Sequence, residues 1–349
     1  MAKNKQEHML VIRLSAMGDV AMTVSVLVGL TRNYPNLSVT VLTKPFFKPL
    51  FSALPNVTVH VADVKGKHKG ILGLWKLFRE LKKLPIDKVA DLHNVLRSNV
   101  LKYFFWGSSI PFVQIDKGRA AKKELTNPNR TTFKPLKTTI NRYCEVFEKL
   151  GYPIILKNTD VLPKQHAAGK VVQFIKNDAK ILLGVAPFAA FEGKMYPAEL
   201  MEKVLITLND TNKYKIILFG GGTNEAKVLT SWEEQFRNTY NAANILSFSE
   251  ELELISNLDL MLAMDSGNAH LAALFGVPTL TLWGVTHPYA GFYPFAQPEG
   301  NSLLADREAY PLIPTSIYGN KHPPGYEKAM ETIRPEAVVQ KIEELLKMV

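Results

Sequence analysis

The sequence predicts an α/β protein built from two doubly wound parallel sheets. Apolar, β-rich segments alternate with helical segments along the chain, and the alternation restarts after a polar stretch at residues 158–169. Such alternation is typical of parallel sheets that carry helices on both faces. The length of 349 residues also exceeds what one hydrophobic core usually holds, which favours two domains.

The first half of the chain starts with a buried strand and a helix that follows a small-residue turn. The predicted strands are Met9–Leu14, Ser38–Thr43, Val57–Ala62, Asp87–Leu92 and Pro111–Ile115. The predicted helices are Val20–Arg32, Ile71–Leu84, Asn99–Trp106 and Leu136–Leu150. Asp19 is placed at or near the N-cap of the first helix. The basic stretch Lys117–Lys137 has little apolar periodicity and is predicted to be a loop.

The second half repeats the pattern. Its predicted strands are Ile181–Ala186, Lys215–Phe219, Asn244–Phe248, Asp259–Ala263 and Pro278–Trp283. Its predicted helices are Ala198–Asn209, Asn224–Tyr240, Glu250–Asn257, Asn268–Phe275 and Pro335–Lys347. His287–Tyr326, rich in Pro, Gly and Tyr, is expected to be a long ordered loop. Because doubly wound sheets bind ligands at the carboxyl ends of their strands, we expect the two sheets to face each other across a ligand-binding cleft.

Composition narrows the function classes. Cys144 is the only cysteine, which excludes an internal disulfide and a multi-cysteine metal site. No apolar run is long enough for a transmembrane helix and the N-terminus does not resemble a signal peptide, so a cytoplasmic protein is expected. The net charge of +10 favours an anionic partner. Without a recognisable nucleic-acid module, a nucleotide or a phosphorylated membrane surface is the better expectation.

Two small-residue turns are candidate phosphate sites. Asp265, Ser266 and Gly267 lie between a strand and a helix, whose first backbone N–H groups are unpaired and suit an anion. An ordinary N-cap explains these residues equally well. Gly220–Gly222 also follows a strand and allows close approach of a ligand, although a flexible turn is nearly as good an explanation. Neither G-x-G-x-x-G nor a P-loop is present, which disfavours a dinucleotide oxidoreductase and a P-loop nucleotidase.

Two segments carry a family resemblance. Leu14–Val20 (L-S-A-M-G-D-V) resembles the first-strand signature of the ADP-heptose:lipopolysaccharide heptosyltransferases, glycosyltransferase family 9. Asp265–Ala273 (D-S-G-N-A-H-L-A-A), followed by Gly276–Thr279 (G-V-P-T), closely resembles the second signature of that family. The motifs occur in the family's order and spacing along nearly the whole chain.

Further elements support the resemblance. Lys194–Pro197 (K-M-Y-P) is similar to the family's Lys-Arg-Trp-Pro element, with Met195 and Tyr196 in place of Arg and Trp. Phe219–Gly221 with Glu225 is similar to its Gly-plus-acid turn. The sequence departs from the family after Trp283, where Gly-Val-Thr-His-Pro and an aromatic stretch follow. Asp91–His93 with Arg97 and Ser98 is similar to a strand end in the family's first half.

The resemblance implies the glycosyltransferase B fold. Residues 1–162 would form the acceptor-binding domain and residues 163–349 the nucleotide-sugar-binding domain, with the final helix a candidate to pack back on the first domain. The implied activity is inverting transfer of a heptose or related sugar, most simply from ADP-heptose, to a lipopolysaccharide core acceptor. A non-catalytic nucleotide-sugar or glycan binder of the same fold is the alternative. No metal or cofactor is expected, because basic side chains and helix N–H groups supply the charge stabilisation.

The resemblance also implies roles for single residues. Asp19 would be the general base rather than a helix cap, and Lys194 would neutralise the leaving phosphates rather than lie in solvent. The other donor-binding residues would be Ser266, Gly267, Asn268, Gly220 and Gly221 at the diphosphate and base, Asp265 at the sugar or bracing the turn, and Glu225 at the ribose. His270 would donate to phosphate, although a packed core histidine is an equally good interpretation.

The acceptor and the membrane are expected to meet basic surfaces. Arg97, Arg119, Lys122 and Lys123 would bind the carboxylates and phosphates of the lipopolysaccharide core, which arginine recognises well. Helix Ile71–Leu84, which carries Trp75 and Phe78 beside basic residues, is a candidate for peripheral contact with the inner face of the inner membrane. A solvated charged helix face explains the same pattern slightly better.

Overall fold

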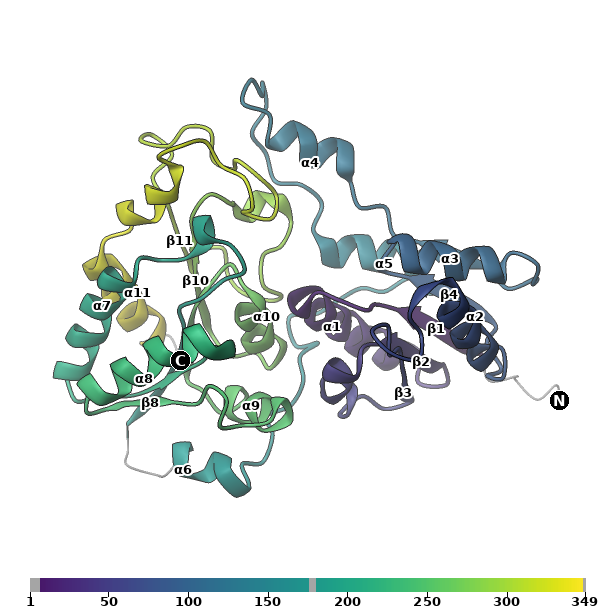
Figure 1. Ribbon diagram of the computed structural model, residues 1–349, viewed down its shortest axis with the longest axis horizontal. Helices are drawn as coiled ribbons and strands as arrows, with labels where there is room; N and C mark the ends of the chain where they lie inside the picture. The colour runs from purple at the N-terminus through teal and green to yellow at the C-terminus, as the bar shows by residue number, and fades with distance from the viewer. Residues whose placement is uncertain (1–6, 176–179, 348–349) are drawn as a thin grey trace. The chain divides into compact units, whose positions relative to one another are not determined.

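The computed structural model describes residues 7–175 and 180–347 and shows two α/β units, each with its own parallel sheet (Figure 1). The first unit comprises residues up to Lys117 together with Lys137–Leu162, and the second comprises Gly118–Leu136 and the chain from Pro163. The chain thus leaves the first unit after Lys117 and returns to it at Lys137. It enters the second unit for good after Leu162. Residues 118–136 were predicted to lie in the first domain, but they contribute to the second unit.

The sheet of the first unit has five strands in the order β3-β2-β1-β4-β5, all parallel. The strands are β1 (His8–Ile12), β2 (Ser38–Thr43), β3 (Val57–Val61), β4 (Lys88–Asp91) and β5 (Phe112–Gln114). The helices are α1 (Met17–Asn33), α2 (Gly70–Leu81), α3 (Leu96–Phe105) and α5 (Thr139–Lys149), with the 3-10 helix η1 (Pro45–Phe51). Leu10 and Ile12 of β1 pack in one core cluster with Leu74, Leu77 and Leu101 of α2 and α3. Helices α1 and α5 pack against each other.

The second unit has a six-stranded parallel sheet in the order β11-β10-β9-β6-β7-β8. The strands are β6 (Ile181–Ala186), β7 (Tyr214–Leu218), β8 (Thr239–Asn241), β9 (Leu260–Met264), β10 (Thr279–Trp283) and β11 (Ser302–Leu304). The helices are α4 (Arg119–Leu125), α6 (Val172–Ile175), α7 (Ala198–Asp210), α8 (Gly222–Gln235), α9 (Phe248–Ile255), α10 (Gly267–Leu274) and α11 (Pro335–Leu346). Short 3-10 turns are η2 (Gly169–Val171), η3 (Glu192–Lys194), η4 (Pro288–Ala290) and η5 (Tyr326–Thr332).

The last helix packs on its own unit. Val338, Ile342 and Leu345 of α11 enter the core cluster that also holds residues of β6, β7, β9 and α7. Figure 1 shows α11 beside α7. Within the described chain, no helix is both long enough and apolar enough to span a bilayer.

Three local predictions were wrong. Residues 117–137 contain α4, a short helix whose one buried side chain, Leu125, leaves little apolar periodicity to detect. The strand expected at Asn244–Phe248 lies earlier, at Thr239–Asn241, because α8 ends at Gln235 and Asn244 adopts a positive φ of 61°. The long loop after β10 includes an edge strand, β11, which pairs with β10.

Candidate active site

Both sheets have their strand-order reversal beside their first strand. In the second unit β6 is flanked by β7 on one side and β9 on the other, so the chain leaves the adjacent strands β6 and β9 in opposite directions. Such a switch point opens a crevice at the carboxyl ends of the two strands, and ligands of doubly wound sheets bind there. The loop after β6 carries Lys194, and the loop after β9 carries Asp265.

Lys194 and Asp265 form a partly buried ion pair at this switch point. Lys194 Nζ lies 2.9 Å from Asp265 Oδ2, and the two side chains are only 13% and 9% exposed. Thr286, which follows β10, donates its hydroxyl to the same Oδ2 at 2.8 Å. The Asp265 carboxylate therefore holds a cation and a hydroxyl from two neighbouring loops. Because both partners bind it there, the Asp265 side chain does not cap α10.

The backbone packs closely around Lys194. Gly319 has a φ of +79°, and a Cβ at this position would lie 2.4 Å from Cγ and Cδ of Lys194. A Cβ on Gly284 would lie 2.3 Å from the carbonyl oxygen of Gly193, which accepts a 2.9 Å hydrogen bond from the Val285 amide. Glycine at these two positions lets the loops after β6 and β10 and the 314–325 segment approach one another and fix the lysine.

The N-terminus of α10 lies directly after Asp265. Ser266 is the N-cap residue in extended backbone conformation and makes no side-chain cap hydrogen bond. Its Oγ is buried and has no hydrogen-bond partner among the described residues. Ser266 is therefore the N-cap by position, but its side chain does not cap the helix. The first N–H groups of α10, including those of Gly267 and Asn268, carry the partial positive charge of a helix N-terminus.

The remaining predicted donor residues lie on the same unit. His270 is 8% exposed on α10, as a packed histidine would be. Gly220 and Gly221 follow β7, and the Glu225 carboxylate accepts a 2.8 Å hydrogen bond from the Gly221 amide. Glu225 thus stabilises the glycine turn in this structure.

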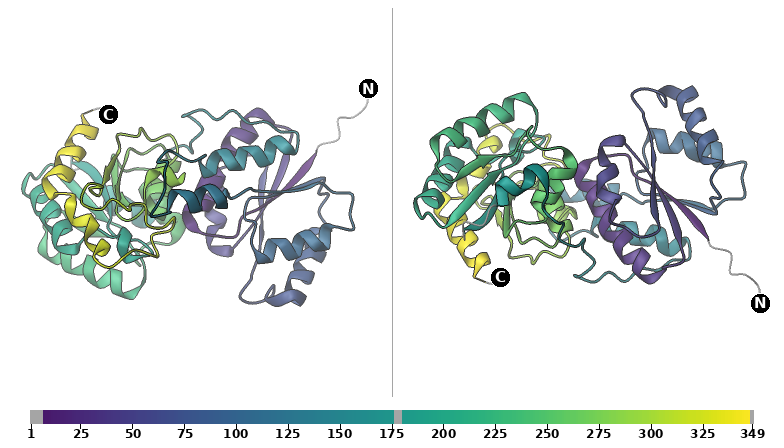
Figure 2. Two further views of the ribbon diagram at one scale, coloured as in Figure 1. Left: turned by 90° about the horizontal axis from the view of Figure 1, so that it is seen from above. Right: turned by 90° about the horizontal axis from the view of Figure 1, so that it is seen from below.

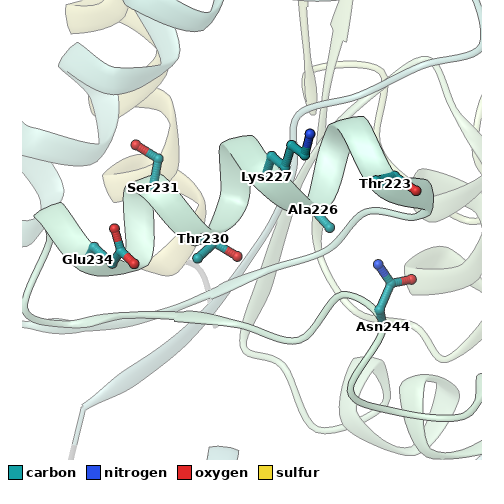
Figure 3. Close-up of a pocket in the computed structure, with 7 residues that line it drawn as sticks. All are labelled: Thr223, Ala226, Lys227, Thr230, Ser231, Glu234 and Asn244. Atoms are coloured by element: carbon teal, nitrogen blue, oxygen red, sulfur yellow. The ribbon is translucent and has the colours of Figure 1, made fainter.

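A separate pocket lies along α8 (Figure 3). It has a volume of about 450 Å³ and is lined by Thr223, Ala226, Lys227, Thr230, Ser231, Glu234 and Asn244. All of these side chains except Asn244 come from one helix face, and Thr223 adjoins the glycine turn in sequence. The pocket contains none of the residues that the sequence predicted for the site.

The structure also explains one departure from the family pattern. Tyr196 is 3% exposed, lies in the core of the second unit and donates its hydroxyl to the Ile333 carbonyl oxygen at 2.6 Å. Burial raises the pKa of Tyr196 above its usual range, so the hydroxyl remains a donor. The side chain therefore anchors the loop that carries Lys194.

The switch point of the first unit lies between β1 and β4 and holds Asp19 in the first turn of α1, where Ala16 and not Asp19 is the N-cap. The Asp19 carboxylate pairs with the guanidinium of Arg13, which follows β1. Arg13 Nη1 also donates to the Leu92 carbonyl oxygen at 2.7 Å, after β4. Asp19 keeps 25% of its side chain exposed, whereas the Arg13 side chain keeps 7%.

Tyr143 of α5 completes this cluster. The guanidinium carbon of Arg13 lies 5.8 Å from the centre of the Tyr143 ring. The Tyr143 hydroxyl donates to the backbone oxygen of Asp19 at 3.4 Å. Burial raises the pKa of this fully buried tyrosine well above its usual value, so it stays neutral. Arg13 thus fixes the carboxylate of Asp19 from one side while leaving it accessible.

His93, directly after β4, lies in a basic environment. Burial, together with the nearby charges of Arg13, Lys117, Lys44 and Arg97, lowers its pKa to about 3. These cations follow β1, β5, β2 and β4, so the loops at one edge of the sheet gather positive charge. Asp91 accepts hydrogen bonds from the backbone amides of His93, at 2.9 Å, and Asn94, at 3.0 Å, and shapes this turn.

The predicted acceptor residues are divided between the units. Arg97 begins α3 in the first unit, whereas Arg119, Lys122 and Lys123 belong to α4 in the second. Lys122 Nζ lies 4.3 Å from the centre of the Phe292 ring. Arg97 therefore does not belong to the same unit as the three basic residues of α4.

Sequence reasoning missed Arg13, Thr286 and Gly319. A charged residue at the end of an apolar strand was the available signal for Arg13. Gly319 contacts Lys194 from more than a hundred residues away, and no local pattern marks that contact. Among residues 7–175 and 180–347, no three or more His, Cys, Asp or Glu side chains are grouped to hold a metal ion.

Known proteins with similar sequences are heptosyltransferases. The profile of glycosyltransferase family 9 (heptosyltransferase) matches residues 74–313. Lipooligosaccharide heptosyltransferase 2 of Haemophilus influenzae is 26% identical over 367 aligned residues, which cover 97% of this chain and 99% of the relative.

Solved structures show the same fold. A family 9 glycosyl transferase from Veillonella parvula matches 99% of both chains with a TM-score of 0.75 and 20% identity. Escherichia coli heptosyltransferase WaaC, solved with ADP, covers 97% of this chain and 99% of its own with a TM-score of 0.68 and 20% identity. The predicted glycosyltransferase B fold, with two parallel-sheet α/β domains, is thereby confirmed.

Proposed function

The chain belongs to glycosyltransferase family 9, the heptosyltransferases, and we propose that it moves a heptose from ADP-heptose to a lipopolysaccharide core acceptor with inversion. Support for the donor and acceptor comes from the similarity to a lipooligosaccharide heptosyltransferase along nearly the whole chain. The observation that carries the proposal is the Lys194–Asp265–Thr286 arrangement beside the uncapped N-terminus of α10.

On the donor side, Lys194 and α10 would hold the diphosphate. A lysine ammonium group and unpaired helix N–H groups are suited to phosphate oxygens, and both stabilise the charge that develops as the nucleoside diphosphate leaves. The buried Ser266 hydroxyl is a further donor, assisted by Gly267 and Asn268. When the diphosphate engages Lys194, Asp265 would be freed to accept hydrogen bonds from sugar hydroxyls. This assignment needs no metal ion.

On the acceptor side, Asp19 would be the general base. It would take the proton of the acceptor hydroxyl as that oxygen bonds to the anomeric carbon and the bond from this carbon to the phosphate oxygen breaks. The neighbouring Arg13 guanidinium holds the carboxylate in place, and a quarter of the Asp19 side chain is exposed to receive a proton. Arg97, Arg119, Lys122 and Lys123 would bind acceptor carboxylates and phosphates. Because the acceptor is a glycolipid, the enzyme would work at the cytoplasmic face of the inner membrane.

The test compares transfer with donor binding in purified protein. We expect Asp19→Asn to lower heptose transfer from ADP-heptose by about 10²- to 10⁴-fold, the usual contribution of a general base, while ADP affinity stays within about twofold. Asparagine keeps an oxygen that accepts from Arg13, and thermal unfolding of the variant checks that it is folded. Lys194→Met is the matched comparison and should weaken ADP binding together with transfer.

Two outcomes would overturn parts of this assignment. Transfer by Asp19→Asn within a few-fold of the unsubstituted protein would remove the base. Tight binding of ADP-heptose without transfer to any core acceptor would favour the non-catalytic binder instead. A thermal-shift panel of ADP-, UDP- and GDP-sugars tests the donor separately, and stabilisation by UDP- or GDP-sugars alone would contradict ADP-heptose.

A further inference from the structure

Helices α2 and α3 of the first unit present large apolar side chains to solvent. Ile71, Leu72 and Trp75 of α2 are exposed, and Leu72 is 79% exposed. On α3, Tyr103 is exposed and the adjoining Trp106 is 84% exposed. The two helices pack against each other and lie side by side in Figures 1 and 2. These five side chains are hereafter called the α2–α3 surface.

The α2–α3 surface is not a frayed part of the core. The other face of α2 supplies Leu74, Leu77, Phe78 and Leu81 to the core cluster. Phe78, which the sequence analysis paired with Trp75 as a candidate membrane contact, is therefore a core residue. The outer face thus carries a second apolar stripe that the fold of the unit does not use, and exposed patches of this kind mark interaction sites.

Aromatic contacts link the two helices. The Trp75 ring lies 5.1 Å from the Phe104 ring of α3 in an edge-to-face arrangement. Phe104 is in turn 6.3 Å from Tyr103. Trp75 and Tyr103 therefore belong to one continuous aromatic group. Tryptophan and tyrosine are the residues enriched at the boundary between lipid headgroups and acyl chains.

The charge on the two helices is predominantly positive. The basic residues of the helices and of the positions next to them are Lys69, Lys76, Arg79, Lys82, Lys83, Arg97 and Lys102. Glu80 is the one acidic residue between positions 69 and 83, and no acidic residue occurs between positions 96 and 106. Glu80 is already paired with Lys67, at 2.5 Å, and His60, at 3.2 Å.

We propose that the α2–α3 surface docks on an anionic phospholipid bilayer. The aromatic and aliphatic side chains would enter the headgroup layer while the lysines and Arg79 contact lipid phosphates, a combination typical of interfacial helices. A second copy of this chain fits less well, because pairing this surface with itself would bring like charges together. Docking on a membrane would bring the protein to the proposed glycolipid substrate. The proposal itself rests on the exposed apolar and basic side chains and does not require that substrate.

Vesicle sedimentation of the full chain, without donor or acceptor, tests the proposal. We expect binding to vesicles of phosphatidylglycerol and phosphatidylethanolamine, at least tenfold weaker binding to phosphatidylcholine, and weakening as salt is raised. Leu72→Ser combined with Trp106→Ser should lower binding at least tenfold, and Lys76→Glu should lower binding to anionic vesicles only. Ile206→Ser, at an exposed apolar position of the second unit, is the matched control and should bind normally.

Three results would overturn the proposal. They are no binding by the unsubstituted protein, equal binding by the Leu72→Ser, Trp106→Ser variant, and a solution dimer that these substitutions dissociate. Far-ultraviolet circular dichroism and thermal unfolding of the same variants are expected to match those of the unsubstituted protein, which verifies that the first unit is folded. Sedimentation does not require sugar transfer. A protein that does not bind vesicles could therefore still be a heptosyltransferase, and a protein without transferase activity could still bind vesicles.

Discussion

Arg13 decides the local chemistry at the carboxyl edge of the first sheet. It pairs with Asp19, donates to the Leu92 carbonyl oxygen and faces the Tyr143 ring, so it links β1, β4, α1 and α5. Removing one partner of a buried ion pair usually costs about 3–5 kcal/mol, because the other charge is left uncompensated. The same pairing holds the Asp19 carboxylate at a fixed position.

A neighbouring residue, His93, should make the first unit sensitive to acid. The folded pKa of about 3 lies below the ordinary histidine pKa of 6.5, so between these values the unfolded chain binds a proton that the folded chain does not. The free energy of unfolding therefore falls as the pH drops from 6.5 toward 3. We expect His93→Gln to reduce the loss between pH 7 and pH 4.5 by ~2 kcal/mol, measured by urea denaturation at both values. Identical losses in both proteins would contradict this prediction.

At the scale of elements, three loops of the second unit meet around one lysine. The loop after β6 supplies Lys194, the loop after β10 supplies Thr286, and the 314–325 segment supplies Gly319. Because β6 and β9 are neighbouring strands, the loop that carries Lys194 lies beside the turn that carries Asp265. Close approach of the other two depends on glycine backbones at residues 284 and 319.

Gly319→Ala should act on Lys194 rather than on the fold. The new Cβ would displace the middle of the lysine side chain, which is flexible, and we expect at least a tenfold loss in transfer. Replacing a glycine of positive φ by alanine costs about 1 kcal/mol of stability through backbone strain. Gly325→Ala is the matched control, because Gly325 has a φ of +88° but nothing within 4 Å of the added atom. Equal activity losses in the two variants would show that backbone strain, and not Lys194, causes the effect.

At the scale of the whole molecule, residues 118–136 belong to the second unit, although the chain on both sides of them belongs to the first. Arg130 donates to the carbonyl oxygens of Pro311 and Ile313, both at 2.8 Å. Phe133 lies against His287, with ring centres 4.9 Å apart, and the Arg307 guanidinium carbon lies 3.6 Å from the Phe133 ring centre. These contacts attach α4 and its basic side chains to the unit that carries Lys194.

Arg130→Met should release this segment. Loss of the charged hydrogen bonds should cost about 1–3 kcal/mol of local stability, and we expect trypsin to cleave at Lys122 and Lys123 several-fold faster than in the unsubstituted protein. Lys134→Met, which removes an exposed cation from the same segment, is the control and should leave the rate unchanged. An unchanged rate in Arg130→Met would mean that the hydrogen bonds to the 311–313 backbone do not hold the segment.

By itself, the sequence determined the two-sheet architecture and most element positions. Its family resemblance also singled out Asp19, Lys194 and Asp265, and the structure pairs the last two. Apolar strands, small-residue turns and helix starts are local patterns, and parallel order places their carboxyl ends at one edge. Only the tertiary structure decided which unit holds α4, where the partners of Asp19 and Asp265 come from, and that Tyr196 and Phe78 are core residues. These facts depend on contacts between segments distant in the chain, which leave no periodic trace in the sequence.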